Sequence, residues 1–390
     1  PTAVNVNMDM TYYLETMHTA AMGEGVSVTV DNISGWNLVG LPAGVEDGSL
    51  LAVYPEGTGG TLYSYDGAYV GGDALVPGEG YWLHFPNAGT TTITGSPITT
   101  LTISLSEGWN LFSGISEVTN VSGISDPGGI IVAGTIYEFT GSYANASMLT
   151  PGHGYWVNAS TDGDITISIA GAAKTRSVFR DYAENTNKLS FNGSNLYFGV
   201  SNPEENMLSY QLPPKPPIGA FDVRFSDNMK VAEIAGAIEI INNTDKLTIA
   251  YTINIGAGEH MNWVLTSENG EDYILKGSGE VTIPSADRFV LTREPVIPIT
   301  FALYQNYPNP FNPITTLKYD LPEDKFVTLT VYDMLGREIT RLVNTTQEAG
   351  YRSVQWDATD SFGKPVSAGV YLYQIRAGEF IQTKKMVLLK

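Results

Sequence analysis

The sequence predicts an all-β fold, in which tandem small β modules are followed by two β-sandwich domains. The 390 residues include 41 glycines together with many Thr, Val and Asn, a mixture that favours short strands and tight turns. Several segments alternate apolar and polar residues with the two-residue period of a strand. Helix signals are scarce, and the one candidate, residues 229–237, is weak. A chain of this length is expected to form about two to four domains.

The charge is distributed unevenly along the chain, and this argues against nucleic acid as a partner. The formal net charge is −20 at pH 7, and no Lys or Arg precedes Lys174, whereas sixteen Asp and Glu do. Such a surface repels phosphate backbones. The solubility of a surface protein explains the pattern, and the alternatives are binding of divalent cations and selection against proteolysis.

The absence of cysteine excludes disulfides, thiolate metal sites and cysteine catalysis. It leaves an extracellular location open, because large cores do not need covalent cross-links. No apolar run reaches the ~18 residues that a membrane-spanning helix needs, so we expect no transmembrane segment. The chain begins at Pro1 without a Met or a signal peptide, and we therefore expect a processed N-terminus.

Residues 1–25 form an N-terminal segment with a strand signal, because apolar residues alternate with polar ones from Val4 to Tyr12. A terminal strand has to pair with another strand. We expect either an edge strand of the first domain or donation to a neighbouring subunit, a standard mode of assembly. Deletion of residues 1–13 distinguishes the two, since only the second requires this strand for oligomerisation.

Residues 26–97 and 98–173 are two copies of one β module. Gly-Trp-Asn-Leu occurs near the start of each copy and Pro-Gly-x-Gly-Tyr-Trp near the end, at an offset of 73 to 74 residues. The glycines of the second motif indicate a turn with positive φ that leads into an aromatic strand. The copies resemble the Gly-Trp-Asn-Leu repeats of large bacterial surface and secreted proteins. That resemblance implies a spacer or an accessory module.

A third β domain, a sandwich, is predicted at residues 188–293, after a more charged boundary at 174–187. Its alternating runs are interrupted by Leu212-Pro213-Pro214-Lys215-Pro216-Pro217, which indicates a polyproline-type connector or an edge loop. Residues 294–298 contain two prolines and predict a short, stiff linker to the C-terminal region.

The C-terminal region, residues 299–390, predicts a second β-sandwich with a rigid beginning. Three prolines lie within the six residues 308–313, and they exclude a helix or a central strand because proline lacks the N–H and clashes with the preceding turn. Alternating strands follow, for example at 316–321 and 369–375.

This region resembles the C-terminal sorting domain of type IX secretion substrates, an immunoglobulin-like (Ig-like) β-sandwich related to the one in flagellar hook-capping proteins. The resemblance covers about a quarter of the chain. The matching residues, in family order, are Tyr307, Pro308, Asn309, Pro310, Phe311, Asn312, Pro313, Gly336, Trp356, Asp357, Gly363, Gly369 and Tyr371. The preceding sandwich, with its proline-rich insert, resembles the domain that often comes before such sorting domains.

The resemblance implies a destination and a partner. The partner is the type IX secretion translocon, which would recognise the folded surface and the end around Lys384 and Lys385. The location is extracellular, or the outer cell surface of a Gram-negative-type bacterium. In many relatives the domain is then cleaved and the passenger is attached to lipopolysaccharide.

The sequence contains no recognisable catalytic constellation, so we expect no enzyme. The four histidines lie in four different segments, and the P-loop, Gly-x-Gly-x-x-Gly and Gly-x-Ser-x-Gly motifs are absent. His153 occupies the place that Glu79 has in the other repeat, which favours a solvated turn residue. We expect no cofactor. Calcium is the alternative, with residues 357–361 and 162–164 as candidate loops, although both are typical of plain turns.

The aromatic residues of the repeats allow two interpretations. Trp36, Trp82, Trp109 and Trp156 recur with the same flanking glycines, which favours a shared core layer over a sugar-binding platform. Tyr69 and Tyr143 follow turn residues and are the candidates for exposed rings that stack on a ligand.

Together these observations predict a non-enzymatic extracellular or cell-surface protein, structural or adhesive, that is exported by type IX secretion. More specifically, we expect a self-assembling filament or surface-layer subunit, with its domains strung separately along the chain. Its partners would be other copies of itself, other surface proteins or glycans. The alternative is a glycan-binding accessory region of a larger secreted hydrolase, and a small secreted enzyme ranks third.

Overall fold

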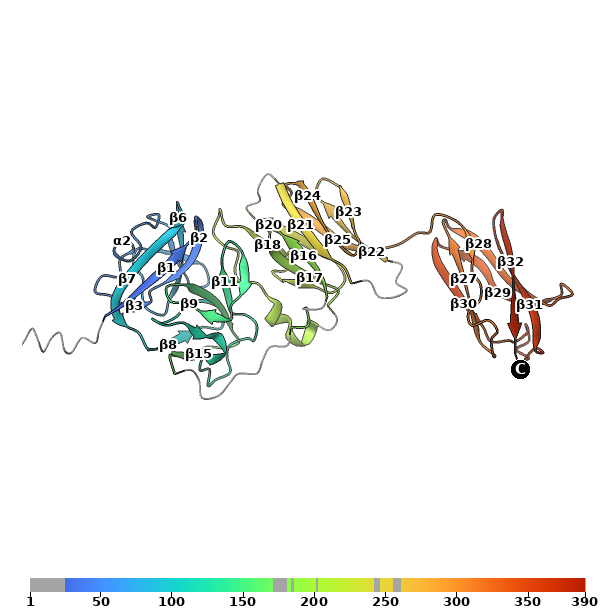
Figure 1. Cartoon of the computed structure of the whole chain (residues 1–390), viewed down its shortest axis with the longest axis horizontal. Coiled ribbons are helices and arrows are strands. Elements are labelled where there is room, and N and C mark those ends of the chain that lie inside the picture. The colour runs from blue at the N-terminus through green and yellow to red at the C-terminus, as the bar shows by residue number, and fades with distance from the viewer. Residues whose placement is uncertain are drawn as a thin grey trace, which may run out of the picture. The chain divides into compact units, whose positions relative to one another are not determined.

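A computed structural model describes residues 25–170, 181–183, 186–200, 203–241, 246–254 and 261–389. Strands dominate these residues, and helix is limited to α2 (Leu50–Val53) and two 3₁₀ segments, η1 (Val121–Gly123) and η2 (Pro203–Tyr210). The predicted all-β class is confirmed. The chain divides into two compact units, one made of residues up to 254 with 265–292 and the other of 255–264 with 293–390 (Figure 1). The expected N-terminal strand lies outside the described residues.

The first repeat is built from two sheets that enclose a small core. Its strands are β1 (Val26–Asn32), β2 (Gly35–Gly40), β3 (Ala43–Gly44), β4 (Leu62–Tyr65), β5 (Tyr69–Gly72), β6 (Gly80–Phe85) and β7 (Gly89–Pro97). The sheet orders are β1-β7-β3 and β2-β6-β4-β5. Val28, Val30 and Ile93 alternate with exposed Thr and Ser along β1 and β7, so one face of that sheet is buried.

The second repeat has the same arrangement. Its strands are β8 (Thr100–Leu105), β9 (Gly108–Ser113), β10 (Thr119–Asn120), β11 (Tyr137–Phe139), β12 (Tyr143–Asn145), β13 (Met148–Leu149), β14 (Gly154–Ala159) and β15 (Gly163–Ser168). The order β9-β14-β11-β12 reproduces β2-β6-β4-β5, and the β8–β15 pair reproduces β1–β7. The internal sequence repeat is therefore a repeat of topology.

Two residues of the Gly-Trp-Asn-Leu motif, the Gly and the Asn, stabilise the turn before the second strand of each repeat. Gly35 and Gly108 both have φ of +94°, which favours glycine. The side chain of Asn37 accepts from the Ile33 N–H at 2.9 Å and donates to the Ile33 carbonyl at 2.8 Å. Asn110 makes the same pair of bonds in the second repeat. The Asn side chain thus closes the turn between the first two strands of each repeat, while the Trp and Leu remain available for packing.

The third domain is a sandwich of two sheets. Its strands are β16 (Asn187–Phe191), β17 (Ser194–Phe198), β18 (Asp222–Phe225), β19 (Val231–Ala232), β20 (Gly236–Ile241), β21 (Lys246–Thr252), β22 (Met261–Ser267), β23 (Asp272–Leu275), β24 (Ser278–Pro284) and β25 (Arg288–Pro295). The described strands form the orders β19-β17-β16-β21-β24 and β18-β20-β25-β22-β23. The rings of Phe191 and Phe289, one from each sheet, meet 5.9 Å apart.

The weak helix expected at residues 229–237 is wrong, because this stretch contains β19 and the beginning of β20. Val231 pairs with Tyr197 in a parallel bridge. Pairing with β17 therefore outweighs the weak local preference of this stretch for helix.

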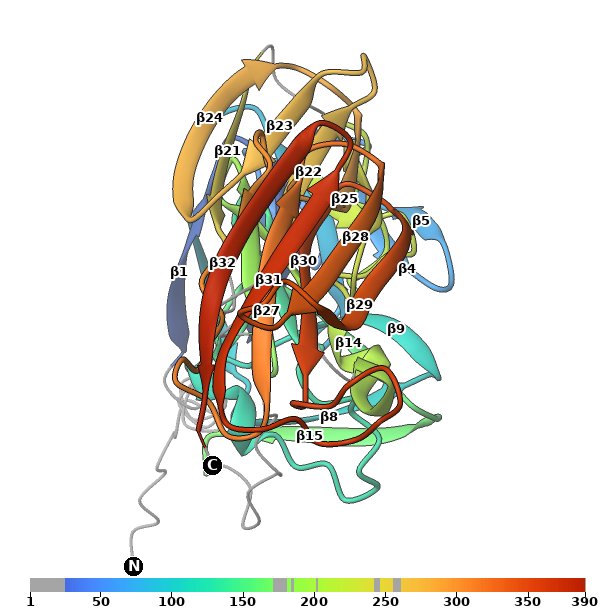
Figure 2. The same cartoon turned by 90° about the vertical axis from the view of Figure 1, so that its right-hand side faces the viewer.

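The C-terminal region forms its own sandwich. Its strands are β26 (Ala302–Leu303), β27 (Thr315–Leu321), β28 (Lys325–Tyr332), β29 (Glu338–Gln347), β30 (Gly350–Trp356), β31 (Gly369–Ala377) and β32 (Phe380–Leu388). Figure 2 shows β29, β28, β31 and β32 in one sheet, and β26-β27-β30 form the other. Inward residues of both sheets, among them Leu317, Leu329 and Ile375, share one core.

The expectation of domains strung separately along the chain is wrong within the larger unit. One cluster of hydrophobic side chains contains Leu38 and Trp82 from the first repeat and Leu111 and Trp156 from the second. Leu212 of the third domain belongs to the same cluster. The three domains of this unit therefore pack together.

Candidate functional site

The two repeats bind each other through reciprocal backbone contacts. The Gly40 N–H donates to the Gly152 carbonyl at 2.9 Å, and the Ser113 N–H donates to the Gly78 carbonyl at 3.0 Å. Gly40 corresponds to Ser113 in the repeat alignment, and Gly78 corresponds to Gly152. Because each repeat uses the same positions on the other, the pair is related by an approximate two-fold axis.

The last glycine of each Pro-Gly-x-Gly motif lets the repeats approach closely. A Cβ on Gly80 would lie 2.5 Å from the Phe112 carbonyl oxygen, and one on Gly154 would lie 2.7 Å from the Val39 carbonyl oxygen. Real Cβ atoms do not tolerate such distances to backbone atoms. The motif predicts a turn from sequence alone, but this contact between repeats needs the structure to be seen.

Aromatic side chains from both repeats converge at this junction, and we name this set the aromatic cradle. Its members are Trp36, Tyr63, Tyr65, Tyr69, Trp82, Trp109, Tyr137, Phe139, Tyr143 and Trp156. Trp82 packs edge-on against Phe139 of the other repeat at 4.8 Å, and Trp156 packs in the same way against Tyr65 at 4.8 Å. Trp82 and Trp156 are fully buried, as expected for a shared core layer, whereas Trp36 and Trp109 are only half-buried.

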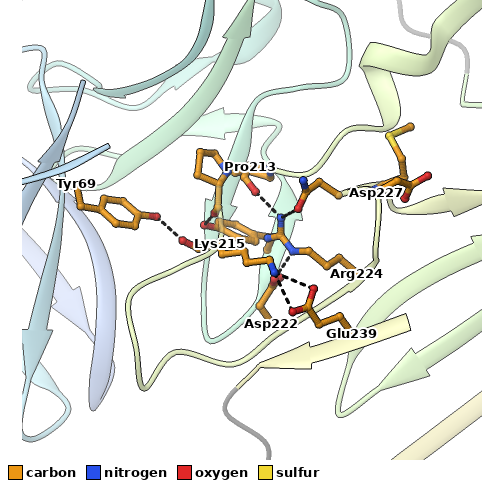
Figure 3. A network of polar contacts seen from close by, with 11 residues as sticks. Tyr69, Pro213, Lys215, Asp222, Arg224, Asp227 and Glu239 are labelled. Carbon is orange, nitrogen blue, oxygen red and sulfur yellow. Dashed lines mark hydrogen bonds and ion pairs between the residues drawn. The ribbon is translucent and has the colours of Figure 1, made fainter. Parts of the chain in front are cut away.

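Residues 212–218, which we name the proline segment, lie against the aromatic cradle. The hydroxyl of Tyr69 donates to the Lys215 carbonyl at 2.8 Å, as Figure 3 shows. The hydroxyl of Tyr143 donates to the Pro214 carbonyl at 2.9 Å. The indole Nε1 of Trp36 donates to the Ile218 carbonyl at 3.0 Å. Three side-chain donors of the cradle thus bind three carbonyls of one short segment.

The structure corrects the expectation that Tyr69 and Tyr143 are exposed rings. Both are only partly accessible, both pack against the buried indoles, and both hydroxyls are engaged by the proline segment. Burial raises the pKa of both phenols, so they remain protonated donors at neutral pH. The two residues do lie together at one site, although the site holds a peptide segment.

The third domain holds the proline segment from its other side. The buried guanidinium of Arg224 donates to the Pro213 carbonyl at 2.9 Å and forms an ion pair with Asp222 at 2.6 Å (Figure 3). Burial raises the pKa of Asp222, and the positive charge of Arg224 opposes that rise. Lys215 Nζ forms a second ion pair with Glu239 at 2.8 Å. The segment is therefore fixed to its own domain as well as to the repeats.

A buried lysine adds a further link between the repeats and the third domain. Lys230 Nζ donates to the side-chain oxygen of Asn145 at 2.8 Å and lies over the rings of Tyr137 and Tyr210. Burial lowers the pKa of Lys230, while the charge of Asp181 raises it. Nothing in the local sequence marks Lys230 as a link, because Asn145 lies 85 positions away.

His153 does not behave as the solvated turn residue that its exchange with Glu79 suggested. It lies at the junction of the repeats, where its backbone forms an isolated antiparallel β-bridge with Val39. The residue is half-buried. Burial lowers its pKa, and the charge of Asp31 opposes that shift.

In the C-terminal sandwich, the segment 307–313 is folded onto the end of the last strand. Phe311 is buried, its N–H donates to the Val387 carbonyl at 3.0 Å, and its carbonyl accepts from Leu389 at 2.9 Å. The side chain of Asn309 accepts from the Val387 N–H at 3.0 Å. The remaining residues of the segment are exposed, namely Tyr307, Pro308, Pro310, Asn312 and Pro313.

The other residues of the sorting-type motif serve the core or the turns. The rings of Phe311 and Tyr371 flank Trp356 at 5.6 and 5.3 Å. Gly336 and Gly363 have φ of +78° and +74° in tight turns, and Gly369 begins β31. The motif therefore combines three residues that meet in space with others that shape separate loops.

In the candidate calcium loops, residues 163 and 164 begin β15, and the carboxylates of Asp162 and Asp357 accept hydrogen bonds from the protein. Asp357 accepts from the N–H and hydroxyl of Thr359, and Asp162 accepts from the Glu107 N–H. No group of three or more acidic or histidine side chains suited to a metal ion is present among the described residues. In the same part of the chain, no helix is long and apolar enough to cross a membrane.

Comparison with known proteins gives a family match and no match among curated proteins, and the solved structures that are similar include two distant ones. Latent dimeric PorU from Porphyromonas gingivalis is 10% identical, over 75% of this chain and 30% of that chain, with a TM-score of 0.20. PorZ, an essential surface component of the type IX secretion system of the same organism, is 10% identical, over 58% of this chain and 49% of that chain, with a TM-score of 0.18.

The chain thus spans less than half the length of either structure, and at these TM-scores neither one carries an argument about the fold. The family match covers residues 314–379 and is described as the FlgD Ig-like domain. The C-terminal sandwich of this all-β chain is therefore Ig-like and, over residues 314–379, is similar to the FlgD Ig-like domain.

Proposed function

We propose that this chain is a non-enzymatic, structural or adhesive protein of the bacterial cell surface, exported by type IX secretion. The observation that carries the proposal is that the segment 307–313 folds onto β32, the last strand of the C-terminal sandwich, whose residues 314–379 are similar to the FlgD Ig-like domain. That segment belongs to the set of motifs by which the sequence resembles type IX sorting domains. The extracellular space or the outer surface is the proposed location, and the type IX translocon is the proposed partner.

The geometry of the segment suits a folded signal. Phe311 anchors it in the core, whereas Tyr307 is 80% exposed and stands free for recognition. Lys384 and Lys385 lie on β32, the strand onto which the segment folds. A translocon could therefore bind the exposed face of the segment together with this strand.

Secretion of a reporter tests the proposal. Residues 299–390 are fused behind a periplasmic reporter in a bacterium with a type IX system, and we expect the reporter in the medium or on the cell surface. The double variant Lys384→Ala/Lys385→Ala should lower its export, whereas Lys318→Ala, an exposed lysine on β27, should not. A reporter that stays in the periplasm behind the unaltered domain would contradict the proposed export route.

The filament or surface-layer role is a separate part of the proposal. Electron microscopy of the purified full chain should show polymers, and monodisperse particles over a range of concentrations would exclude it. The glycan-binding alternative has less support, because Tyr69 and Tyr143 are engaged by the proline segment. A glycan array is therefore expected to be negative.

A further inference from the structure

The contact between the aromatic cradle and the proline segment has the features of peptide recognition. We propose that the aromatic cradle is a binding site for proline-rich polypeptide and that residues 212–218 are its built-in ligand. The ligand class is an extended segment rich in proline that presents carbonyl oxygens. This inference concerns the larger unit alone and does not depend on the proposed export route.

The chemistry of the cradle matches this ligand class. Proline-rich chain has no internal hydrogen bonds, so its carbonyls are available to a partner, and its rings pack well on aromatic faces. The cradle offers both an aromatic surface and donors aimed at the carbonyls of residues 214, 215 and 218. It uses tyrosine hydroxyls and an indole N–H, which are uncharged donors.

The two tyrosines occupy equivalent positions in the two repeats. Tyr69 and Tyr143 are 74 residues apart, and their hydroxyls bind the adjacent carbonyls of Lys215 and Pro214. Neither repeat alone contains both donors. The site therefore exists only where the repeats meet, which indicates a shared binding site of the pair.

The third domain presents the segment in a preset shape. Arg224 binds the Pro213 carbonyl, and Glu239 binds the Lys215 side chain, both from strands of the third-domain sandwich. Ordering a flexible ligand costs free energy on binding, and a ligand that is already ordered avoids part of that cost. The segment is thus held like a peptide on a scaffold and inserted into the cradle.

The proposal is tested by the binding of a synthetic peptide to a full-length variant whose aromatic cradle no longer holds the proline segment. We call this variant the emptied chain. In this variant residues 212–218 are replaced by an equal length of Gly and Ser, and near-ultraviolet circular dichroism checks that the chain is folded. A peptide of residues 211–220 should then change the tryptophan fluorescence saturably. The unaltered chain should not respond to the peptide, because its cradle is already filled.

Point variants identify the donors. In the emptied chain, Tyr69→Phe and Tyr143→Phe should each weaken peptide binding about 2- to 10-fold, the effect of one hydrogen bond. Tyr307→Phe, an exposed tyrosine of the other unit, should have no effect. A folded emptied chain that does not bind the peptide would overturn the proposal, and so would equal binding of a peptide whose four prolines are alanines.

A second experiment keeps the segment in place, in case the emptied chain does not fold. Trypsin cuts poorly before proline, so Pro216→Ala creates a cleavable bond after Lys215. Adding Tyr69→Phe and Tyr143→Phe to this variant should speed cleavage of that bond about 5- to 100-fold, because the segment leaves the cradle more often. Mass spectrometry of the fragments measures the rate, and Tyr307→Phe is the matched control. An unchanged rate would show that the tyrosines do not retain the segment.

Discussion

At the scale of single residues, Gly80 and Gly154 allow the two repeats to pack closely because they have no side chain. Each lies where the backbone of the other repeat passes within reach of a Cβ. Their neighbours Gly78 and Gly152 have positive φ and shape the turn, so the motif contains glycines of two different kinds. The sequence shows the repetition of the motif but not which glycine serves which purpose.

Alanine at the contact position should destabilise the larger unit. We expect Gly154→Ala to cost about 1–3 kcal/mol, because the new methyl group overpacks against the Val39 carbonyl. Urea denaturation measures the loss. Gly72→Ala is the control, since a Cβ there would meet nothing within 4 Å and the backbone needs no positive φ. Equal stability of the two variants would contradict the close approach.

His153 predicts a dependence of stability on pH. Burial lowers its pKa, so the folded chain takes up this proton less readily than the unfolded chain. The contribution of neutral His153 is complete above the unfolded pKa near 6.5 and is lost as the pH falls below it. The thermal midpoint of the larger unit should therefore fall more between pH 7 and pH 5 in the unaltered chain than in His153→Gln. Parallel curves for the two proteins would show that the histidine is not responsible.

At the scale of elements, the segment 307–313 and the end of β32 depend on each other. Asn306 is buried beside them, and its side-chain amide donates to the Pro308 carbonyl at 3.0 Å and to the Thr315 hydroxyl at 2.9 Å. A buried acceptor that loses its donor costs more free energy than an average hydrogen bond is worth. Asn306 thus fixes the beginning of the domain, although it precedes the motif that the sequence makes conspicuous.

Removal of the Asn306 side chain should loosen this closure. We expect Asn306→Ala to destabilise the C-terminal sandwich by about 1–3 kcal/mol and to speed hydrogen exchange at the amides of Val387 and Leu389. Asn344→Ala, an exposed position on β29, should change neither quantity. If the exchange of these amides stays the same while stability falls, Asn306 acts on the core and not on the closure.

The buried ion pair behind the proline segment is a second element-scale feature with a measurable consequence. Arg224→Ala would leave the Asp222 carboxyl buried without its ion-pair partner and the Pro213 carbonyl without its donor. We expect a loss of about 3–5 kcal/mol, partly recovered in Asp222→Ala/Arg224→Ala because no lone buried charge remains. Urea denaturation of the two variants measures the recovery, and a double variant that is less stable than Arg224→Ala would contradict it.

Strands follow from the sequence far better than their partners do. Alternation along β1 and β7 is visible directly, since one face of each strand is buried. The proline segment was identifiable as a connector, yet its contact with Tyr69 joins residues 146 positions apart. Local pattern carries no information about such a distant partner. This is why the rings that looked like free ligand-binding tyrosines turned out to be occupied.

At the scale of the whole molecule, the chain consists of two units that each have a core of their own. We expect calorimetry of the full chain to show two thermal transitions. Gly154→Ala should lower the midpoint of one and Asn306→Ala that of the other, because the substituted residues belong to different units. A single transition that both substitutions shift equally would mean that the chain unfolds as one cooperative body.

The approximate two-fold relation of the repeats has a consequence for how such a chain could have arisen. Half of the pair, synthesised alone, would expose Trp82 and the ring of Tyr65, and its best available partner would be a second identical half. The ancestor implied by this geometry is a homodimer of single modules, whose one gene was later duplicated and fused in tandem. After fusion the sequences of the two halves were free to diverge. The aromatic cradle on the two-fold axis could then bind a single segment that has no two-fold symmetry of its own, the proline segment.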